Sequence, residues 1–240
     1  MGGAVGAGLS RVLFVGNSFT YFHNLPQQLA VLARPEVEVV PRMIAAGGAI
    51  LGETWPTGPP AAALRAGTDF VVLQEQSMLG GGVVVDDIPR PRDPADFHSA
   101  VRTAVADIRA AGAVPALYLT WARRDDPEAQ EALTDAYVSI GSELDVAVVP
   151  VGLAWQAALS ARPEFVLHDE DESHPAPAGS YLAACVFLKT LFNLDPRGRA
   201  RNISGVTIDS EGAPGEDGTL IDLSATDAAF LQDIAWRTTC

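Results

Sequence analysis

The sequence predicts a three-layer α/β/α sandwich around a central, mostly parallel sheet of five strands. Short apolar runs rich in β-branched residues alternate along the chain with longer amphipathic segments. The short runs lack the polar alternation of half-exposed strands, which is typical of parallel strands that are covered on both faces. Right-handed crossovers between such strands place helices on both sides of the sheet, as in a doubly wound fold.

Five segments fit the strand pattern, because each is brief and bounded by turn-forming or polar residues. The predicted strands are residues 12–15 (VLFV), 37–44 (VEVVPRMI), 69–74 (DFVVLQ), 115–121 (PALYLTW) and 145–152 (DVAVVPVG).

Five longer segments fit the helix pattern, and two of them carry clear start signals. Asn24 and Asp93 are suitable N-caps, and Pro26 and Pro94 stand in the first turns that follow. The predicted helices are residues 24–33, 93–113, 127–144, 177–192 and 225–239.

Two glycine-rich and acidic stretches are expected to be irregular. Residues 78–94 follow the third strand, so we expect them to form a mobile flap beside any site at the strand ends. Residues 205–220 are expected to be a surface excursion.

Length and composition indicate one domain, 1–240, with residues 1–10 flexible. The chain has 240 residues, of which 48% are hydrophobic and 19% charged, which is ordinary for a globular protein with a buried core. The net charge of −14 argues against a nucleic-acid partner, because such partners require clustered Lys and Arg. The sequence predicts no oligomeric state.

The sequence shows no pattern typical of a disulfide framework, a zinc site or a signal peptide. Cys185 and Cys240 lie far apart and indicate neither a disulfide framework nor a zinc site. The N-terminal residues lack the basic and apolar regions of a signal peptide, and no apolar run is long enough to insert into a membrane. The chain is therefore expected to be soluble and cytoplasmic, although a chain trimmed from a secreted precursor would also lack these segments.

Residues capable of acyl-transfer chemistry follow several of the predicted strands. Ser18 follows the first strand, AAGGA (45–49) the second and QEQS (74–77) the third, while Asp171 and His174 form a D-x-x-H pattern after the last. The carboxyl ends of parallel strands share one sheet edge. A hydroxyl, backbone N–H groups, an amide and a carboxylate–imidazole pair could therefore meet there. This chemistry requires no metal and no cofactor.

Other chemistries lack their motifs. The sequence contains no G-x-x-x-x-G-K-[ST] phosphate loop, no G-x-G-x-x-G after a strand and no G-x-S-x-G around a serine. Nucleotide binding and the α/β-hydrolase fold are therefore disfavoured.

The ordered motifs resemble those of the SGNH hydrolases, the superfamily of GDSL-type esterases and lipases. VLFVGNSFT (12–20) resembles its first block, Gly47–Gly48 its second, VVLQEQS (71–77) its third and DESHPAPAGSYLAA (171–184) its last. The resemblance implies a flavodoxin-like fold and a catalytic triad of Ser18, His174 and Asp171. It also implies an oxyanion hole formed by Ser18, Gly48 and the side chain at position 76.

Two positions depart from the family pattern. Asn17 stands where the family usually has Asp, and it can still bond the turn. Gln76 stands where an Asn usually completes the oxyanion hole, so Gln76 is expected to supply the amide on a longer arm, with Gln74 as the alternative. Gly47 is the alternative to Gly48. Asn17, Gly47, Gln74 and Trp121 are the expected substrate-binding residues.

The expected function is that of a serine esterase that cleaves a carboxylic ester through an acyl-enzyme. The small-molecule substrate would carry a short acyl group on a carbohydrate or another polar carrier. One alternative is a non-catalytic binding module that holds a sugar or an anion in the same strand-end pocket. A second is a cation site formed by His168, Asp169, Asp171 and His174. Trp55 either borders the pocket or packs its loop, and His23 and His98 are expected to have no catalytic part.

Overall fold

A parallel sheet of five strands forms the centre of the molecule, as predicted. The computed structural model describes residues 8–75, 79, 84–85, 88–89 and 93–240. All strand pairs of this sheet are parallel, in the order β2-β1-β3-β6-β7. The strands are β1 (Gly8–Gly16), β2 (Val37–Ala45), β3 (Phe70–Leu73), β6 (Val114–Leu119) and β7 (Ala147–Pro150).

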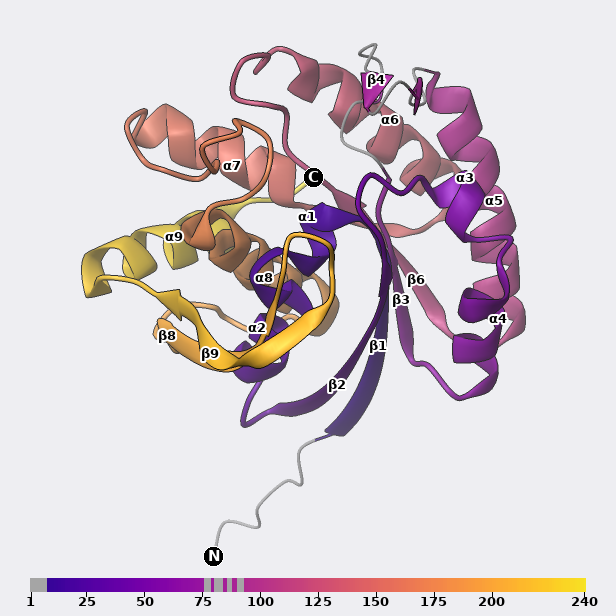
Figure 1. Cartoon of the computed structure of the whole chain (residues 1–240), viewed down its shortest axis with the longest axis horizontal. Coiled ribbons are helices and arrows are strands. Elements are labelled where there is room, and N and C mark those ends of the chain that lie inside the picture. The colour runs from indigo at the N-terminus through magenta and orange to yellow at the C-terminus, as the bar shows by residue number, and fades with distance from the viewer. Residues whose placement is uncertain (1–7, 76–78, 80–83, 86–87, 90–92) are drawn as a thin grey trace, which may run out of the picture.

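Helices cover both faces of the sheet, which gives the three predicted layers (Figure 1). One face is covered by α2 (Leu25–Leu32), α7 (Val151–Ala161), α8 (Pro177–Phe192) and α9 (Ala225–Arg237). The other is covered by α3 (Leu51–Thr54), α4 (Gly58–Arg65), α5 (Pro94–Ala110) and α6 (Ala129–Leu144).

The apolar strand residues divide between two cores because successive side chains of a strand point to opposite faces. In β1, Val12 and Phe14 join the core beneath α2 and α8, whereas Leu13 and Val15 join the core beneath α5 and α6. All four are at most 1% exposed. The lack of polar alternation in the sequence therefore reflects burial on both sides.

The predicted helix starts are confirmed. Asn24 caps α2 by accepting the N–H of Gln27, and Asp93 caps α5 by accepting the N–H of Ala95 at 2.8 Å. Helix α8 has the predicted bounds of 177–192. Among the helices in the described part of the chain, none has the length and apolar character needed to cross a membrane.

Several bounds differ from the prediction. Strand β1 begins at Gly8 and pairs along its whole length with β2, so residues 8–10, expected to be flexible, belong to the sheet. The predicted strand 145–152 is shorter, because β7 ends at Pro150 and α7 begins at Val151. Helix α7 is strongly apolar, which conceals its helical period in the sequence. Helix α4 was not predicted.

The stretch expected to be an irregular excursion, 205–220, instead lies within an antiparallel hairpin. Strands β8 (Asn202–Ile208) and β9 (Pro214–Asp222) pair with two register irregularities. The many glycines and acids of this segment conceal the strand pattern. In the predicted flap, 78–94, β4 (Val84–Val85) pairs with β5 (Ile88–Pro89), and most of the other flap positions lie outside the described residues.

Candidate active site

Ser18 lies at the carboxyl end of β1, as the first residue of the short helix α1 (Ser18–Tyr21; Figure 1). Strand β1 ends at Gly16, where a Cβ atom would lie 2.4 Å from Gln74 Oε1 and 2.5 Å from Thr20 Oγ1. Only glycine permits this close approach. The chain therefore turns tightly from strand to helix and presents the serine at the edge of the sheet.

Asn17 connects three segments at this edge. Its Oδ1 accepts the N–H of Phe19 at 3.1 Å and the side-chain N–H of Gln74 at 2.9 Å. Its Nδ2 donates to the carbonyl oxygen of Ala49, in the turn after β2, at 3.1 Å. An amide can both donate and accept, whereas a carboxylate would have no N–H for Ala49. These contacts engage both ends of Asn17, which was expected to bind substrate.

Asp171 and His174 lie in the loop between α7 and α8. The Oδ1 atom of Asp171 accepts the backbone N–H groups of Ser173 at 2.9 Å and His174 at 2.8 Å. Its Oδ2 contacts Nδ1 of His174. Burial raises the pKa of Asp171, but the hydrogen bonds from His174 and Ser173 outweigh burial, so this pKa lies below its ordinary value. The ionised carboxylate thereby fixes the orientation of the imidazole.

The structure brings together the three residues of the predicted triad. Nε2 of His174 lies 2.8 Å from the hydroxyl oxygen of Ser18. Ser18 is 7% exposed, and the side chains of His174 and Asp171 are 28% and 49% exposed. A hydroxyl bonded to an imidazole, which is bonded in turn to a carboxylate, is the arrangement that makes serine a nucleophile.

Two aromatic rings that the sequence analysis missed enclose His174. The ring of Phe22 stacks on the imidazole, with centroids 4.3 Å apart and planes at 10°. Phe19 meets it edge-on at 5.6 Å. Both rings follow Ser18 within the segment SFTYF, so their proximity in sequence was the available signal. They restrict rotation of the imidazole.

Trp121 lies in the core, against the residues next to Ser18 and His174. It is 1% exposed, and its ring stacks between Phe19 at 4.6 Å and Trp155 at 3.9 Å. Its Nε1–H donates to the carbonyl oxygen of Ser173 at 3.0 Å. The structure therefore places Trp121, expected to contact substrate, where it supports the loop of Asp171 and His174.

Gln74 is also engaged within the protein. Its Oε1 accepts the backbone N–H of Asn17 at 2.9 Å and the hydroxyl of Thr20 at 2.8 Å. Its Nε2 donates to Asn17 and to the carbonyl oxygen of Glu75 at 2.6 Å. Gln74 is 1% exposed, so it supports the turn at Ser18 and is not aimed at a substrate. Gln76, the expected third oxyanion donor, lies outside the described residues.

Gly47 and Gly48 form the turn that follows β2. Gly48 has a φ of +63°, in the left-handed region that favours glycine. A Cβ atom on Gly47 would lie 3.5 Å from the hydroxyl oxygen of Tyr21, which is ordinary contact. The backbone conformation therefore requires glycine more strictly at position 48 than at position 47.

The other histidines have structural partners. His168 donates from Nε2 to the carbonyl oxygen of Ala122 at 3.0 Å, and burial lowers its pKa. His98 contacts the carbonyl oxygen of Ala136 at 2.7 Å, and His23 contacts the hydroxyl of Ser180 at 3.0 Å. Across 8–75, 79, 84–85, 88–89 and 93–240, no three His, Cys, Asp or Glu side chains form a group that could hold a metal ion.

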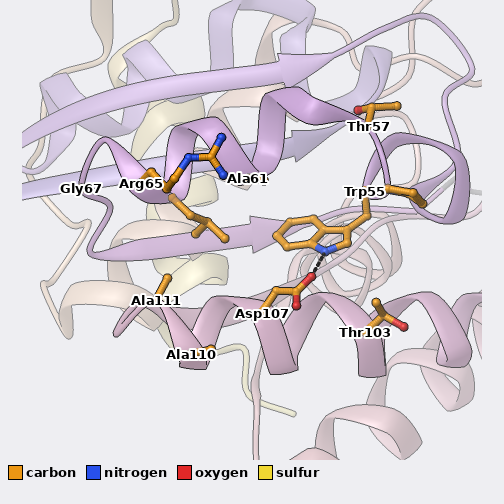
Figure 2. Close-up of a pocket in the computed structure, with 11 residues that line it drawn as sticks. Trp55, Thr57, Ala61, Arg65, Gly67, Thr103, Asp107, Ala110 and Ala111 are labelled. Atoms are coloured by element: carbon orange, nitrogen blue, oxygen red, sulfur yellow. Dashed lines mark hydrogen bonds between the residues drawn. The ribbon is translucent and has the colours of Figure 1, made fainter.

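A separate groove of about 790 Å³ lies between α4 and α5 (Figure 2). Trp55 is 6% exposed and lines the groove. Its Nε1–H donates to Oδ2 of Asp107 at 2.9 Å. None of the residues that line the groove belongs to the arrangement around Ser18. Trp55 therefore packs α3 against α5, away from the triad.

Several solved structures are similar to this chain. A proposed SGNH hydrolase from Slackia heliotrinireducens is 30% identical, with a TM-score of 0.62 over 77% of this chain and 100% of that one. An acetylxylan esterase from Geobacillus stearothermophilus is 14% identical, with a TM-score of 0.59 over 81% of this chain and 99% of that one. A lipolytic G-D-S-L family protein from Veillonella parvula is 13% identical, with a TM-score of 0.59 over 78% and 100%. No family model and no curated protein matches the chain.

Proposed function

Because this chain belongs to the SGNH hydrolases and is a serine ester hydrolase, we propose that Ser18, His174 and Asp171 are its catalytic triad. The observation that carries this proposal is the 2.8 Å contact between Ser18 Oγ and His174 Nε2, with Asp171 on the other ring nitrogen. Nucleophile, base and orienting group are thus connected in the order that ester cleavage needs.

The proposed reaction has two halves. His174 Nε2 takes the proton of the Ser18 hydroxyl as Oγ attacks the ester carbonyl carbon. The tetrahedral intermediate collapses, the bond to the alcohol oxygen breaks, and His174 returns the proton to that oxygen. Water then enters, gives a proton to His174 and attacks the acyl carbon. The bond between that carbon and Ser18 Oγ breaks, His174 returns the proton to Oγ, and the acid leaves.

The negative charge on the carbonyl oxygen requires donors that are fixed in advance. We assign this role to the backbone N–H groups of Ser18 and Gly48, with the side-chain amide of Gln76 as a third donor. The left-handed turn at Gly48 and the Asn17 contact to Ala49 support this assignment, because both fix the turn after β2.

A short acyl group on a carbohydrate is the first ester to test. The Geobacillus relative of this fold is an acetylxylan esterase, and the acetyl group is the smallest common acyl group on sugars. Esters of longer acids, offered as 4-nitrophenyl esters of increasing chain length, measure how much acyl chain the site accepts.

A fluorophosphonate probe tests the nucleophile directly. We expect the wild-type protein to be labelled and Ser18→Ala to remain unlabelled, with 4-nitrophenyl acetate hydrolysis lower by about 10³-fold or more. His174→Ala should lower the rate of 4-nitrophenyl acetate hydrolysis by a similar factor. Equal labelling of Ser18→Ala would exclude Ser18 as the nucleophile, and a folded, unlabelled wild-type protein would favour the binding-module alternative.

A further inference from the structure

The hairpin β8–β9 is fastened to the segment that carries Ser18. The hydroxyl of Tyr21, at the end of α1, donates to the carbonyl oxygen of Ser210 at 2.7 Å. Gly212, with a φ of +84°, lies so close to Tyr21 that a Cβ atom would come within 3.2 Å of its ring. Asn24 donates from Nδ2 to the carbonyl oxygen of Val206 at 2.8 Å. The loop of the hairpin consequently lies beside α1 (Figure 1).

A cavity of about 190 Å³ lies between this hairpin and the residues that follow α1. Phe22, Ile208 and Leu220 give it an apolar surface, and its polar lining residues are His23, Thr207, Asp209, Ser210 and Thr219. It is smaller than the roughly 300–1,000 Å³ of sites for drug-sized ligands, so it suits a single small ring.

The cavity is close to the proposed general base. Phe22 lines it, and the same ring stacks on His174 at 4.3 Å. When an ester is cleaved, the departing alcohol oxygen receives its proton from the general acid and must lie beside that group. An alcohol portion that leaves beside His174 could reach the cavity past the ring of Phe22, while the acyl portion stays near the proposed oxyanion donors.

Asp209 contributes an acidic side chain to the lining of the cavity. Its Oδ1 accepts the backbone N–H groups of Glu211 at 3.0 Å and Ala213 at 2.8 Å, so the orientation of the carboxylate is fixed. An ionised carboxylate only accepts hydrogen bonds. It favours hydroxyl donors and, together with Glu211, disfavours anionic groups. Phe22, whose ring also stacks on His174 and Tyr21, adds apolar surface that suits the C–H groups of a sugar ring.

Resting on the proposed esterase function, we propose that this cavity binds the alcohol portion of the substrate, and that this alcohol is a neutral, polyhydroxylated ring such as a sugar. Asp209 and Thr219 bind its hydroxyl groups, and Phe22, Ile208 and Leu220 contact its apolar face. The hairpin is thus a determinant of specificity that lies outside the central sheet.

Asp209→Asn is the informative substitution. Asn retains an Oδ1 acceptor for Glu211 and Ala213, but it replaces the second carboxylate oxygen with a donor. Asp217→Asn is the matched control, because it makes the same charge change on an exposed residue of β9 that does not line the cavity. Thr219→Val is a second test variant that removes only a hydroxyl.

The assay compares two kinds of acetyl ester. The first is a panel of monoacetylated methyl glucosides and xylosides, and the second is 4-nitrophenyl acetate, whose alcohol carries no further hydroxyl group. We expect Asp209→Asn to raise KM about tenfold for the sugar ester that the wild type cleaves best, with kcat within about twofold. The KM for 4-nitrophenyl acetate, whose alcohol offers no hydroxyl group to Asp209, should change much less than the KM for the sugar ester, and Asp217→Asn should match the wild type on both esters.

Several outcomes would overturn the proposal. The cavity is not the alcohol site if the wild type cleaves 4-nitrophenyl acetate but no sugar ester. The same conclusion follows if Asp209→Asn and Thr219→Val behave like Asp217→Asn, or if they weaken both esters equally. Failure of the esterase function would look different, because Ser18→Ala would then match the wild type on 4-nitrophenyl acetate.

Discussion

Trp121 donates its indole N–H to the carbonyl oxygen of Ser173, the residue immediately before His174, at 3.0 Å. The same ring stacks on Phe19, the residue immediately after Ser18. One buried side chain therefore contacts both chain segments that supply the proposed triad, and it helps to set the separation between Ser18 and His174.

Trp121→Phe is expected to lower kcat for 4-nitrophenyl acetate by about tenfold with little change in KM. A 1 Å displacement of a catalytic group can cost up to about a hundredfold, and the phenyl ring keeps the stack while losing the N–H donor. Steady-state kinetics measures the effect. Trp155→Phe is the control, because within the described residues the Trp155 Nε1–H has no hydrogen-bond partner. Equal kcat values for the two variants would assign Trp121 to packing alone.

Asn17→Asp is expected to lower both stability and activity. The carboxylate can still accept from Phe19 and Gln74, but it cannot donate to Ala49, whose carbonyl oxygen is then left without this partner. Loss of this bond should reduce the free energy of unfolding by about 1–3 kcal/mol. Urea denaturation and kcat/KM measure the two effects. If Asn17→Asp were as active and stable as the wild type, the contact with Ala49 would not position the turn at Gly48.

Gly48→Ala and Gly47→Ala should have unequal effects. Gly48 is in the left-handed region, where alanine is strained by roughly 1–3 kcal/mol, whereas alanine at position 47 makes only ordinary contact with Tyr21. We expect Gly48→Ala to lower kcat by about 10²-fold, on the order of the loss of an oxyanion donor, and Gly47→Ala to lower it by less than about threefold. A larger loss at position 47 would transfer the donor role to Gly47.

The stabilising effect of Asp171 should depend on pH. Its pKa is lower in the folded protein than its ordinary value of about 3.9. Between these two values the unfolded chain binds more protons, so stability rises with pH. The contribution is therefore complete above about pH 5 and is lost as the pH falls toward the lowered pKa. Melting temperatures of the wild type and Asp171→Asn from pH 3.5 to 7 measure this effect.

The difference between those two melting temperatures should be largest above pH 5 and shrink below pH 4. Asp217→Asn serves as the control, because it makes the same charge change at an exposed position of β9. A difference that stays constant across the range would mean that ionisation of Asp171 does not stabilise the fold.

The sequence predicted the features that depend on local pattern. Buried parallel strands and capped helices leave strong local signals, and the carboxyl ends of such strands meet by topology. Ser18, Asp171 and His174 were therefore expected at one edge. Hairpin β8–β9 was missed because residues such as Gly215 and Asp217 disfavour strands, and because its register irregularities interrupt the alternation that marks a strand.

The directions of individual side chains could not be predicted. Gln74 and Trp121 stand at strand ends, where their polar groups could form hydrogen bonds either with a substrate or within the protein. In the structure, the Gln74 amide donates to Asn17 and Glu75, and the Trp121 N–H donates to Ser173. That outcome depends on packing between distant elements and leaves no periodic signal in the chain.

The hydrogen-bonded partners Ser18 and His174 are 156 positions apart in the chain. Their contact is among the most non-local in the molecule, and closing so long a loop costs entropy that only the nearly complete fold repays. Reactivity of Ser18 with a fluorophosphonate should therefore appear late during refolding, after helical circular dichroism has recovered. The rate at which Ser18 becomes reactive would thus also report the rate of the final stage of folding.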